Sequence, residues 1–94
     1  KARDKIDIQE QKDGSYLIDG SAAIREINKK LSWDLPLEGP VTLNGLILEK
    51  IQTIPESNVS INLNNYLIET VLIKDNMIKF AKILKLSISE PKED

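Results

Sequence analysis

The spacing of apolar residues changes near Pro55, and this change constrains the fold more than any other feature of the sequence. Before Pro55, apolar residues recur at helical intervals of three and four; after it, apolar and polar residues alternate as in a strand. Helical and strand segments kept apart along a chain are typical of an α+β fold. We therefore predict an antiparallel sheet of about four strands with two helices packed on one face.

Two amphipathic helices are predicted before Pro55. In the first, the Ser21 hydroxyl can accept a backbone N–H as N-cap, and the apolar positions are Ile24, Ile27 and Leu31. In the second, Thr42 is the predicted N-cap, Pro55 stops the helix, and the apolar positions are Leu43, Leu46, Ile47, Ile51 and Ile54. Gly45 costs such a helix about 1 kcal/mol relative to alanine, so we expect close approach of another backbone in compensation.

Strands are predicted at 15–18, 59–63, 66–73 and 78–86, with tight turns at the Asn64-Asn65 and Asp75-Asn76 pairs. The last segment is ambiguous, because its lysines, spaced by three, would also form the polar stripe of an amphipathic helix on a membrane surface. We favour the strand, since the 66–73 strand otherwise lacks a partner after the turn.

The chain divides into three predicted parts. Residues 1–12 are a linker or edge segment, residues 13–86 form the domain, and residues 87–94 are a flexible acidic tail. The chain begins at Lys1 rather than methionine, which suggests a piece of a longer protein. The predicted core of the domain consists of Leu17, Ile24, Ile27, Leu31, Leu43, Leu46, Ile47, Ile51, Val59, Ile61, Val71 and Phe80.

The residue types that are missing exclude several classes of function. Among 94 residues there is no cysteine and no histidine, which excludes disulfide scaffolds, Cys/His zinc sites and the usual Ser-His or Cys-His nucleophiles. The net charge of −2 and the 4% of aromatic residues argue against nucleic-acid binding. No apolar run approaches the roughly 18–20 residues of a membrane span. Carboxylate chemistry is the enzymatic route that remains.

Four motifs in order resemble the CorC/HlyC transporter-associated domain. They are the double turn DGSYLIDGS at 13–21, the WDLP element at 33–36, the run TLNGLILE at 42–49 and the pair IP at 54–55. The resemblance covers about residues 13–86. The residues that carry these motifs, which we expect to be structural, are Asp13, Gly14, Asp19, Gly20, Asp34, Leu35, Pro36, Gly45 and Pro55.

The resemblance implies a setting for the domain. Members of this family lie at the C-terminus of proteins with a membrane domain and a pair of CBS domains, which are associated with magnesium and cobalt efflux or labelled hemolysins. It thus implies a non-enzymatic regulatory domain on the cytoplasmic face of the cell membrane, soluble as a fragment. The implied partners are the CBS pair, the membrane domain or another copy of itself. The related fold of certain flavoproteins raises the alternative of a module that binds flavin adenine dinucleotide or a nucleotide.

Each candidate for ligand chemistry has a structural explanation. Asp13 and Asp19 supply too few oxygens for a hard cation, and turn chemistry explains both Asp-Gly pairs. A phosphate at Gly39 and Gly45 would lie near Glu38 and Glu49, and no phosphate-binding motif is present. Asp34 and Glu38 are the remaining candidate for a catalytic pair of carboxylates. The sequence indicates no pocket that would shift their pKa values. We therefore predict no catalytic residues and no metal site, and assign no cofactor-binding residue.

Two surface features have alternative interpretations. Trp33 either anchors a partner or covers one end of a small core, and we favour the core. Arg25, Lys29 and Lys30 form a basic helix face, which we interpret as solvated rather than as a site for lipid or an acidic partner.

Overall fold

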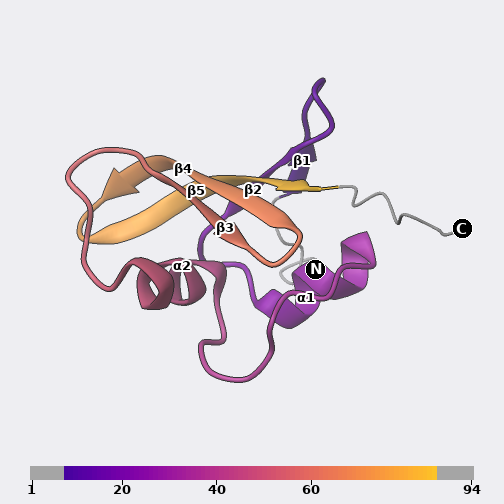
Figure 1. The fold of residues 1–94 in the computed structure, drawn as a ribbon, viewed down its shortest axis with the longest axis horizontal. Coiled ribbons are helices and arrows are strands. Elements are labelled where there is room, and N and C mark those ends of the chain that lie inside the picture. Colours follow the sequence, from indigo (N-terminus) through magenta and orange to yellow (C-terminus); the bar gives the residue numbers. More distant parts are fainter. Residues whose placement is uncertain (1–7, 87–94) are drawn as a thin grey trace, which may run out of the picture.

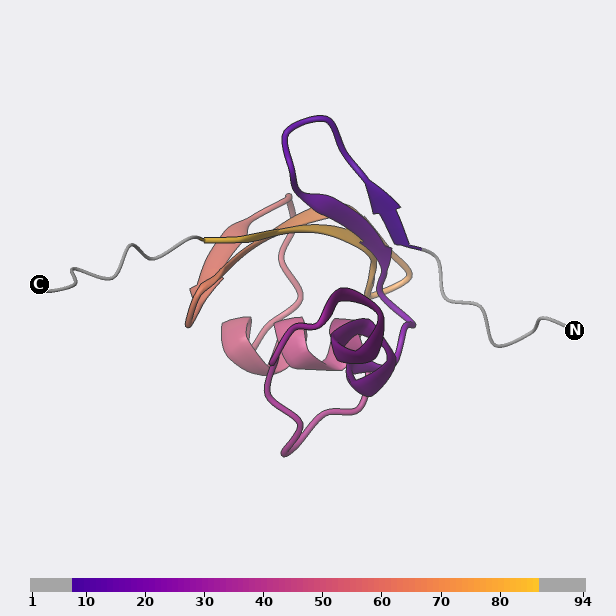
Figure 2. The same ribbon diagram turned by 90° about the vertical axis from the view of Figure 1, so that its right-hand side faces the viewer.

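A computed structural model, which describes residues 8–86, confirms the α+β class. The elements are β1 (Ile8–Glu10), β2 (Tyr16–Asp19), α1 (Ile24–Leu31), α2 (Leu43–Ile51), β3 (Ser60–Leu63), β4 (Tyr66–Lys74) and β5 (Met77–Lys85). The strands form one antiparallel sheet in the order β1-β2-β5-β4-β3, and both helices cover the same face of it (Figures 1 and 2). The fifth strand, β1, lies in the segment predicted as linker or edge. The predicted acidic tail lies outside the described residues.

The segment 78–86 is a strand, as predicted, and the alternative of a membrane-surface helix is wrong. β5 pairs with β4 on one side and with β2 on the other, which makes it the central strand of the sheet. The predicted turn at Asp75 and Asn76 joins β4 to β5, with φ angles of 56° and 62°. Two consecutive positive φ angles are the signature of the two-residue hairpin turn that matches strand twist. Within residues 8–86, neither helix is long or apolar enough to cross a membrane.

The prediction of Ser21 as the N-cap of the first helix is wrong. Helix α1 begins at Ile24 after Ala23, which makes no side-chain cap. Ser21 lies two residues before this N-cap position, and its hydroxyl donates to the Asp19 carboxylate at 2.9 Å within the Asp-Gly turn. The backbone N–H of Ile24 is satisfied by the Val41 carbonyl at 2.8 Å, so the loop before α2 supports the start of α1.

Helix α2 has the predicted N-cap but ends earlier than predicted. The Thr42 hydroxyl accepts a hydrogen bond from the Gly45 N–H at 3.1 Å. The helix ends at Ile51, where Gln52 turns left-handed and donates its N–H to the Leu48 carbonyl at 2.7 Å. Pro55 therefore follows the helix without stopping it. Ile54, predicted on the apolar stripe, is outside the helix and 37% exposed.

The core lies between the helices and the inner face of the sheet. Five of the predicted core residues are fully buried there: Ile24, Ile27, Leu43, Leu46 and Ile47. Three more pack against this cluster while partly exposed: Leu31, Ile51 and Ile61. The sequence analysis missed several buried residues, among them Ile18, Leu35, Tyr66, Ile68, Ile78, Ala81 and Ile83.

Some predicted core residues lie on the outer face of the sheet. The prediction that Val71 belongs to the core is wrong. Val71 is 41% exposed and falls at a register shift between β4 and β5, where it has no partner on β5. Leu17 lies beside Lys82, on the face opposite the buried Ile18, and is half-buried. Val59 and Phe80 are likewise only half-buried. Alternate residues of a strand face opposite sides of the sheet. When both faces carry apolar residues, the sequence does not indicate which face the helices cover.

The neighbour of Gly45 is a side chain rather than the predicted backbone. A Cβ atom built on Gly45 would lie 3.1 Å from the Cβ of Pro40 and 3.4 Å from the Thr42 hydroxyl oxygen. We expect Gly45→Ala to lower the free energy of unfolding by up to about 1 kcal/mol, because overpacking strain slightly outweighs the gain in helix propensity. Urea unfolding, with the exposed Lys50→Ala as control in the same helix, measures this difference. A higher unfolding midpoint for Gly45→Ala would contradict the expectation.

Candidate functional site

The two Asp-Gly turns of the first motif have the same internal hydrogen bonds. One carboxylate oxygen of Asp13 accepts from the backbone N–H and the hydroxyl of Ser15, and Asp19 accepts in the same way from Ser21. An aspartate that bonds the backbone two residues later defines an Asx-turn. In residues 8–86 no three His, Cys, Asp or Glu side chains come together as metal ligands. The turns account for both aspartates.

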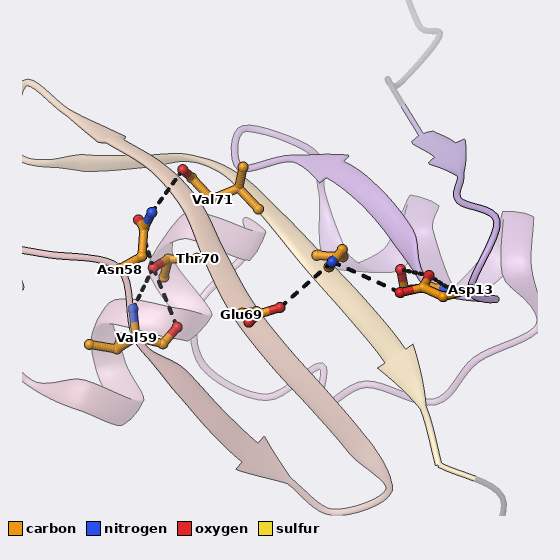
Figure 3. A network of polar contacts seen from close by, with 8 residues as sticks. Asp13, Asn58, Val59, Glu69, Thr70 and Val71 are labelled. Atoms are coloured by element: carbon orange, nitrogen blue, oxygen red, sulfur yellow. Dashed lines mark hydrogen bonds and ion pairs between the residues drawn. The ribbon is translucent and has the colours of Figure 1, made fainter.

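Asp13 also reaches the outer face of the sheet. Its second carboxylate oxygen lies 3.9 Å from the ammonium of Lys82, which lies 3.8 Å from Glu69 on the other side (Figure 3). Lys82 on β5 pairs with Glu69 on β4, so this charged row links the turn between β1 and β2 to two strands of the sheet. These side chains are 36–62% exposed, and exposed ion pairs contribute little to stability.

The pKa of Asp13 offers a test of the turn. The hydrogen bond from the Ser15 hydroxyl, followed by that from its N–H, holds the pKa of Asp13 below the ordinary 3.8. A lowered folded-state pKa stabilises the fold above pH 3.8, and this contribution is lost as the pH falls through the folded-state value. In an NMR titration we expect Ser15→Ala to raise the Asp13 pKa, and Lys82→Gln to raise it less. A larger effect of Lys82→Gln would contradict this assignment.

The second turn holds the two halves of the fold together at Gly20. The Gly20 N–H donates to the Lys79 carbonyl, and the Gly20 carbonyl accepts from the Asn44 N–H, both at 2.8 Å. The Asn44 side chain then accepts from the Ile78 N–H at 2.7 Å. A Cβ atom on Gly20 would lie 1.9 Å from the Ile78 carbonyl oxygen. Gly20 is therefore the motif glycine at which backbones approach closely.

The WDLP element is held by two side chains that the sequence analysis did not single out. The Asn28 amide donates to the Leu35 carbonyl at 3.0 Å and accepts from the Leu35 N–H at 2.9 Å. The Tyr66 hydroxyl donates to the Asp34 carboxylate at 2.7 Å and accepts from the Asp34 N–H at 3.0 Å. Leu35 is thereby buried, while Pro36 continues into the loop. Burial raises the pKa of Tyr66 above 10.0, so its hydroxyl stays a donor at neutral pH.

Trp33 covers one end of the core, as the favoured interpretation predicted. Its ring packs between two tyrosines, edge-on to Tyr16 at 5.6 Å between ring centroids and tilted against Tyr66 at 5.1 Å. Trp33 is partly buried against the core cluster. Such aromatic pairs add about 0.5–1.5 kcal/mol beyond area burial. The only tryptophan of the chain is thus part of the structural support of the WDLP element.

A second polar network, also missed, supports the outer strands. The hydroxyl of Thr70, a buried side chain of β4, accepts from the Val59 N–H at 2.9 Å and donates to the side-chain amide oxygen of Asn58 at 3.1 Å (Figure 3). The Asn58 amide donates to the Val71 carbonyl at 3.1 Å. This network fixes the chain before β3 against the register shift of β4. A polar Thr-Asn pair without a motif carries no sequence signal for this role.

The candidates for phosphate binding and catalysis gain no support from their surroundings. A Cβ atom on Gly39 would lie 3.7 Å from the Glu49 carboxylate, which would repel a phosphate there. The Asp34 carboxylate is engaged by Tyr66, and Glu38 is an exposed loop residue. The geometry is consistent with a structural role for Asp34 and with a solvated side chain at Glu38.

A hollow in the described part of the chain lies away from these residues. It measures about 330 Å³ and is bounded by the first turn of α1 (23–26) and by Leu37, Pro40 and Val41. A smaller hollow of about 90 Å³ adjoins the Asp13–Lys82–Glu69 row, and another of about 320 Å³ adjoins Asn58 and Thr70. The motif residues thus surround the core, and the open surface of the first hollow is formed by a different set of residues.

The fold is a small antiparallel sheet with two helices on one face, in which the motif residues make their contacts within the domain. The model of the CorC_HlyC family, described as transporter associated domain, matches residues 9–87. The chain belongs to this family, which confirms the resemblance noted from the motifs.

Known proteins agree with this membership. The chain is 44% identical over 80 residues to a UPF0053 protein of Haemophilus influenzae and 42% identical over 77 residues to the UPF0053 inner membrane protein YfjD of Escherichia coli. These alignments cover 85% and 82% of this chain, but 19% and 18% of the relatives. A crystal structure of a conserved protein of unknown function from Haemophilus influenzae superposes with a TM-score of 0.80 at 44% identity. It covers 85% of this chain and 99% of that one.

Proposed function

We propose that this chain is a non-enzymatic regulatory domain of a hemolysin-like membrane ion-transport protein concerned with magnesium and cobalt efflux. The observation that carries the proposal is its family membership combined with its share of its relatives: it matches a fifth of proteins of which one is named an inner membrane protein. We infer that the domain acts together with the rest of such a protein. The proposed location is the cytoplasmic face of the cell membrane.

The proposed partners are the other parts of the same protein, a CBS pair and a membrane domain, or a second copy of the chain. The arrangement of the motif residues supports this view, because Asp13, Asp19, Gly20 and Asp34 are engaged in turns and contacts within the domain. Such residues preserve the shape of a module whose outer surface makes the contacts. Domain interfaces within a chain usually bury about 600–1,500 Å², which the exposed faces of this domain can supply.

Deletion in cells tests the regulatory role. In the full-length protein, residues 13–86 are replaced by a flexible Gly/Ser linker of matched span, and cobalt tolerance and magnesium efflux are measured at equal protein levels in the membrane. We expect altered efflux with unchanged membrane insertion. Unchanged efflux at equal levels would contradict the proposal.

Titration of the purified domain separates this function from the flavin or nucleotide alternative. Calorimetry with flavin adenine dinucleotide, ATP and Mg²⁺ is expected to give flat traces. Saturable binding tighter than about 10 μM, equivalent to nearly −7 kcal/mol, would favour the binding module instead. A flavin-loaded preparation would also be yellow.

A further inference from the structure

The hollow beside α1 has the properties of a docking pocket. Its walls are the first turn of α1 (23–26) and the loop residues Leu37, Pro40 and Val41. Val41 and Leu37 are 72% and 58% exposed, the highest values among the large apolar side chains of the described residues. Exposed apolar side chains gathered at one hollow with a polar rim mark an interaction site more often than scattered ones do. An apolar side chain of a partner would cover both.

The pocket is held in shape by backbone hydrogen bonds. The Val41 carbonyl accepts from the Ile24 N–H at 2.8 Å, and Leu43 donates to the Ala22 carbonyl at 3.0 Å, so that Ala23 and Thr42 form an antiparallel bridge. The loop is therefore fixed to the start of α1 on either side of the exposed Val41. A site that needs no rearrangement loses less affinity to ordering on binding.

The charged residues around the pocket favour an acidic partner. Arg25 lines the pocket and Lys29 lies one helical turn further along the same face of α1. In residues 8–86 both ion pairs involve Lys82, so neither of these cations has a carboxylate within 4.0 Å there. Glu26 is the acidic residue of the lining, and Glu38 lies in the adjoining loop. The Glu49 carboxylate also lies beside Gly39 of that loop. The positive excess is therefore on α1, where Arg25, Lys29 and Lys30 stand against Glu26 alone.

We propose that this pocket binds an acidic, apolar peptide segment of another domain of the same protein. One large apolar side chain fills the space between Leu37 and Val41, and flanking carboxylates pair with Arg25 and Lys29. This inference rests on the proposed function, since it names the chemistry of the partner that a regulatory module would contact. It makes the basic face of α1, interpreted from sequence as merely solvated, part of an interface.

Titration of the isotope-labelled domain with synthetic peptides tests the site. The probes are a Glu/Leu hexapeptide and a Lys/Leu hexapeptide with the same leucine positions. We expect the acidic peptide to shift the amide resonances of 23–26 and 37–41, and high salt to weaken it, because exposed charge pairs are screened. Absence of shifts at millimolar peptide, shifts centred elsewhere, or equal binding of the basic peptide would overturn the proposal.

Three variants assign the contacts. Arg25→Glu is expected to weaken acidic-peptide binding at least fivefold, and Val41→Ser to weaken both peptides, while neither changes the fold. Lys50→Glu, the same charge reversal in the last turn of α2, serves as control and is expected to bind as the original does. If Lys50→Glu weakened acidic-peptide binding as much as Arg25→Glu, the effect would come from the net charge of the domain, and the proposed binding at this pocket would be rejected.

Failure of this inference can be told apart from failure of the proposed function. Arg25→Glu is introduced into the full-length protein beside the linker replacement. Altered efflux with the linker but not with Arg25→Glu rejects the pocket and leaves the regulatory role intact. Altered efflux with both, at equal membrane levels, supports the two proposals together. No change with either rejects the regulatory role, whatever the peptides do.

Discussion

Gly20→Ala is expected to unfold the domain or to lower its free energy of unfolding by more than about 4 kcal/mol, a loss that single substitutions seldom cause. The new Cβ atom would lie 1.9 Å from the Ile78 carbonyl oxygen, and both atoms belong to the backbone or are fixed to it. Relief of this clash requires β5 to move away from Gly20. That movement breaks the hydrogen bond from the Gly20 N–H to the Lys79 carbonyl and the one from the Ile78 N–H to the Asn44 side chain.

Gly14→Ala is the matched control for this substitution, since Gly14 stands at the same place in the first Asp-Gly turn. Nothing lies within 4 Å of a Cβ atom there, but φ is +90°. We expect its cost to be limited to backbone strain of about 1–2 kcal/mol. Circular dichroism and urea unfolding of both variants give the comparison. If Gly20→Ala costs no more than Gly14→Ala, the close approach at Gly20 is not what stabilises the junction.

The second large effect is expected for Tyr66→Ala, which removes a buried ring from the core. Truncation of a buried aromatic side chain typically costs about 3–5 kcal/mol. Here the ring also packs against Trp33, and its hydroxyl holds Asp34, so the WDLP element loses its support on one side. The emission of Trp33, the only tryptophan, is expected to shift to longer wavelength as the ring becomes hydrated.

Tyr66→Phe separates the ring from the hydroxyl. It keeps the contact with Trp33 and removes the hydrogen bonds to Asp34, for an expected cost of about 1–2 kcal/mol, because Asp34 is exposed and its charge is partly solvated. Trp33 emission is expected to change little. A loss in Tyr66→Phe as large as in Tyr66→Ala would mean that the hydroxyl, not ring packing, fixes this end of the core.

The order of elements could be predicted from the sequence because local patterns agree with the fold. Helical spacing around Ile24 and Leu43 and the turns at 64–65 and 75–76 place the elements near their observed positions. The face that each strand buries could not be predicted in the same way. In β4 and β5, apolar residues occur on both faces, and the register shifts around Leu72 change the alternation, so Val71 was assigned to the wrong side.

The candidate site was less accessible to sequence reasoning than the fold. Motifs identified Gly20 and Leu35, but the roles of these residues depend on Ile78 and Asn28, which contact them from distant or unremarked positions. Close approach of a second backbone was predicted at Gly45 but occurs at Gly20. The positions of glycines in a sequence do not indicate which of them lies beside another backbone. The pocket joins a helix start to a loop more than ten residues later, a contact that only the bridge between Ala23 and Thr42 creates.

The position of β5 at the centre of the sheet bears on how the domain acquires its structure during synthesis. Every other described element precedes β5, yet β2 and β4 do not pair with each other and meet only through it. Tyr16 finds its partner Ile83 almost at the far end of the domain, the kind of distant pairing that slows folding. A nascent chain that stops short of β5 consists of a β1–β2 hairpin, two helices and a β3–β4 hairpin without a common sheet. The sheet can therefore assemble cooperatively only after β5 has left the ribosome.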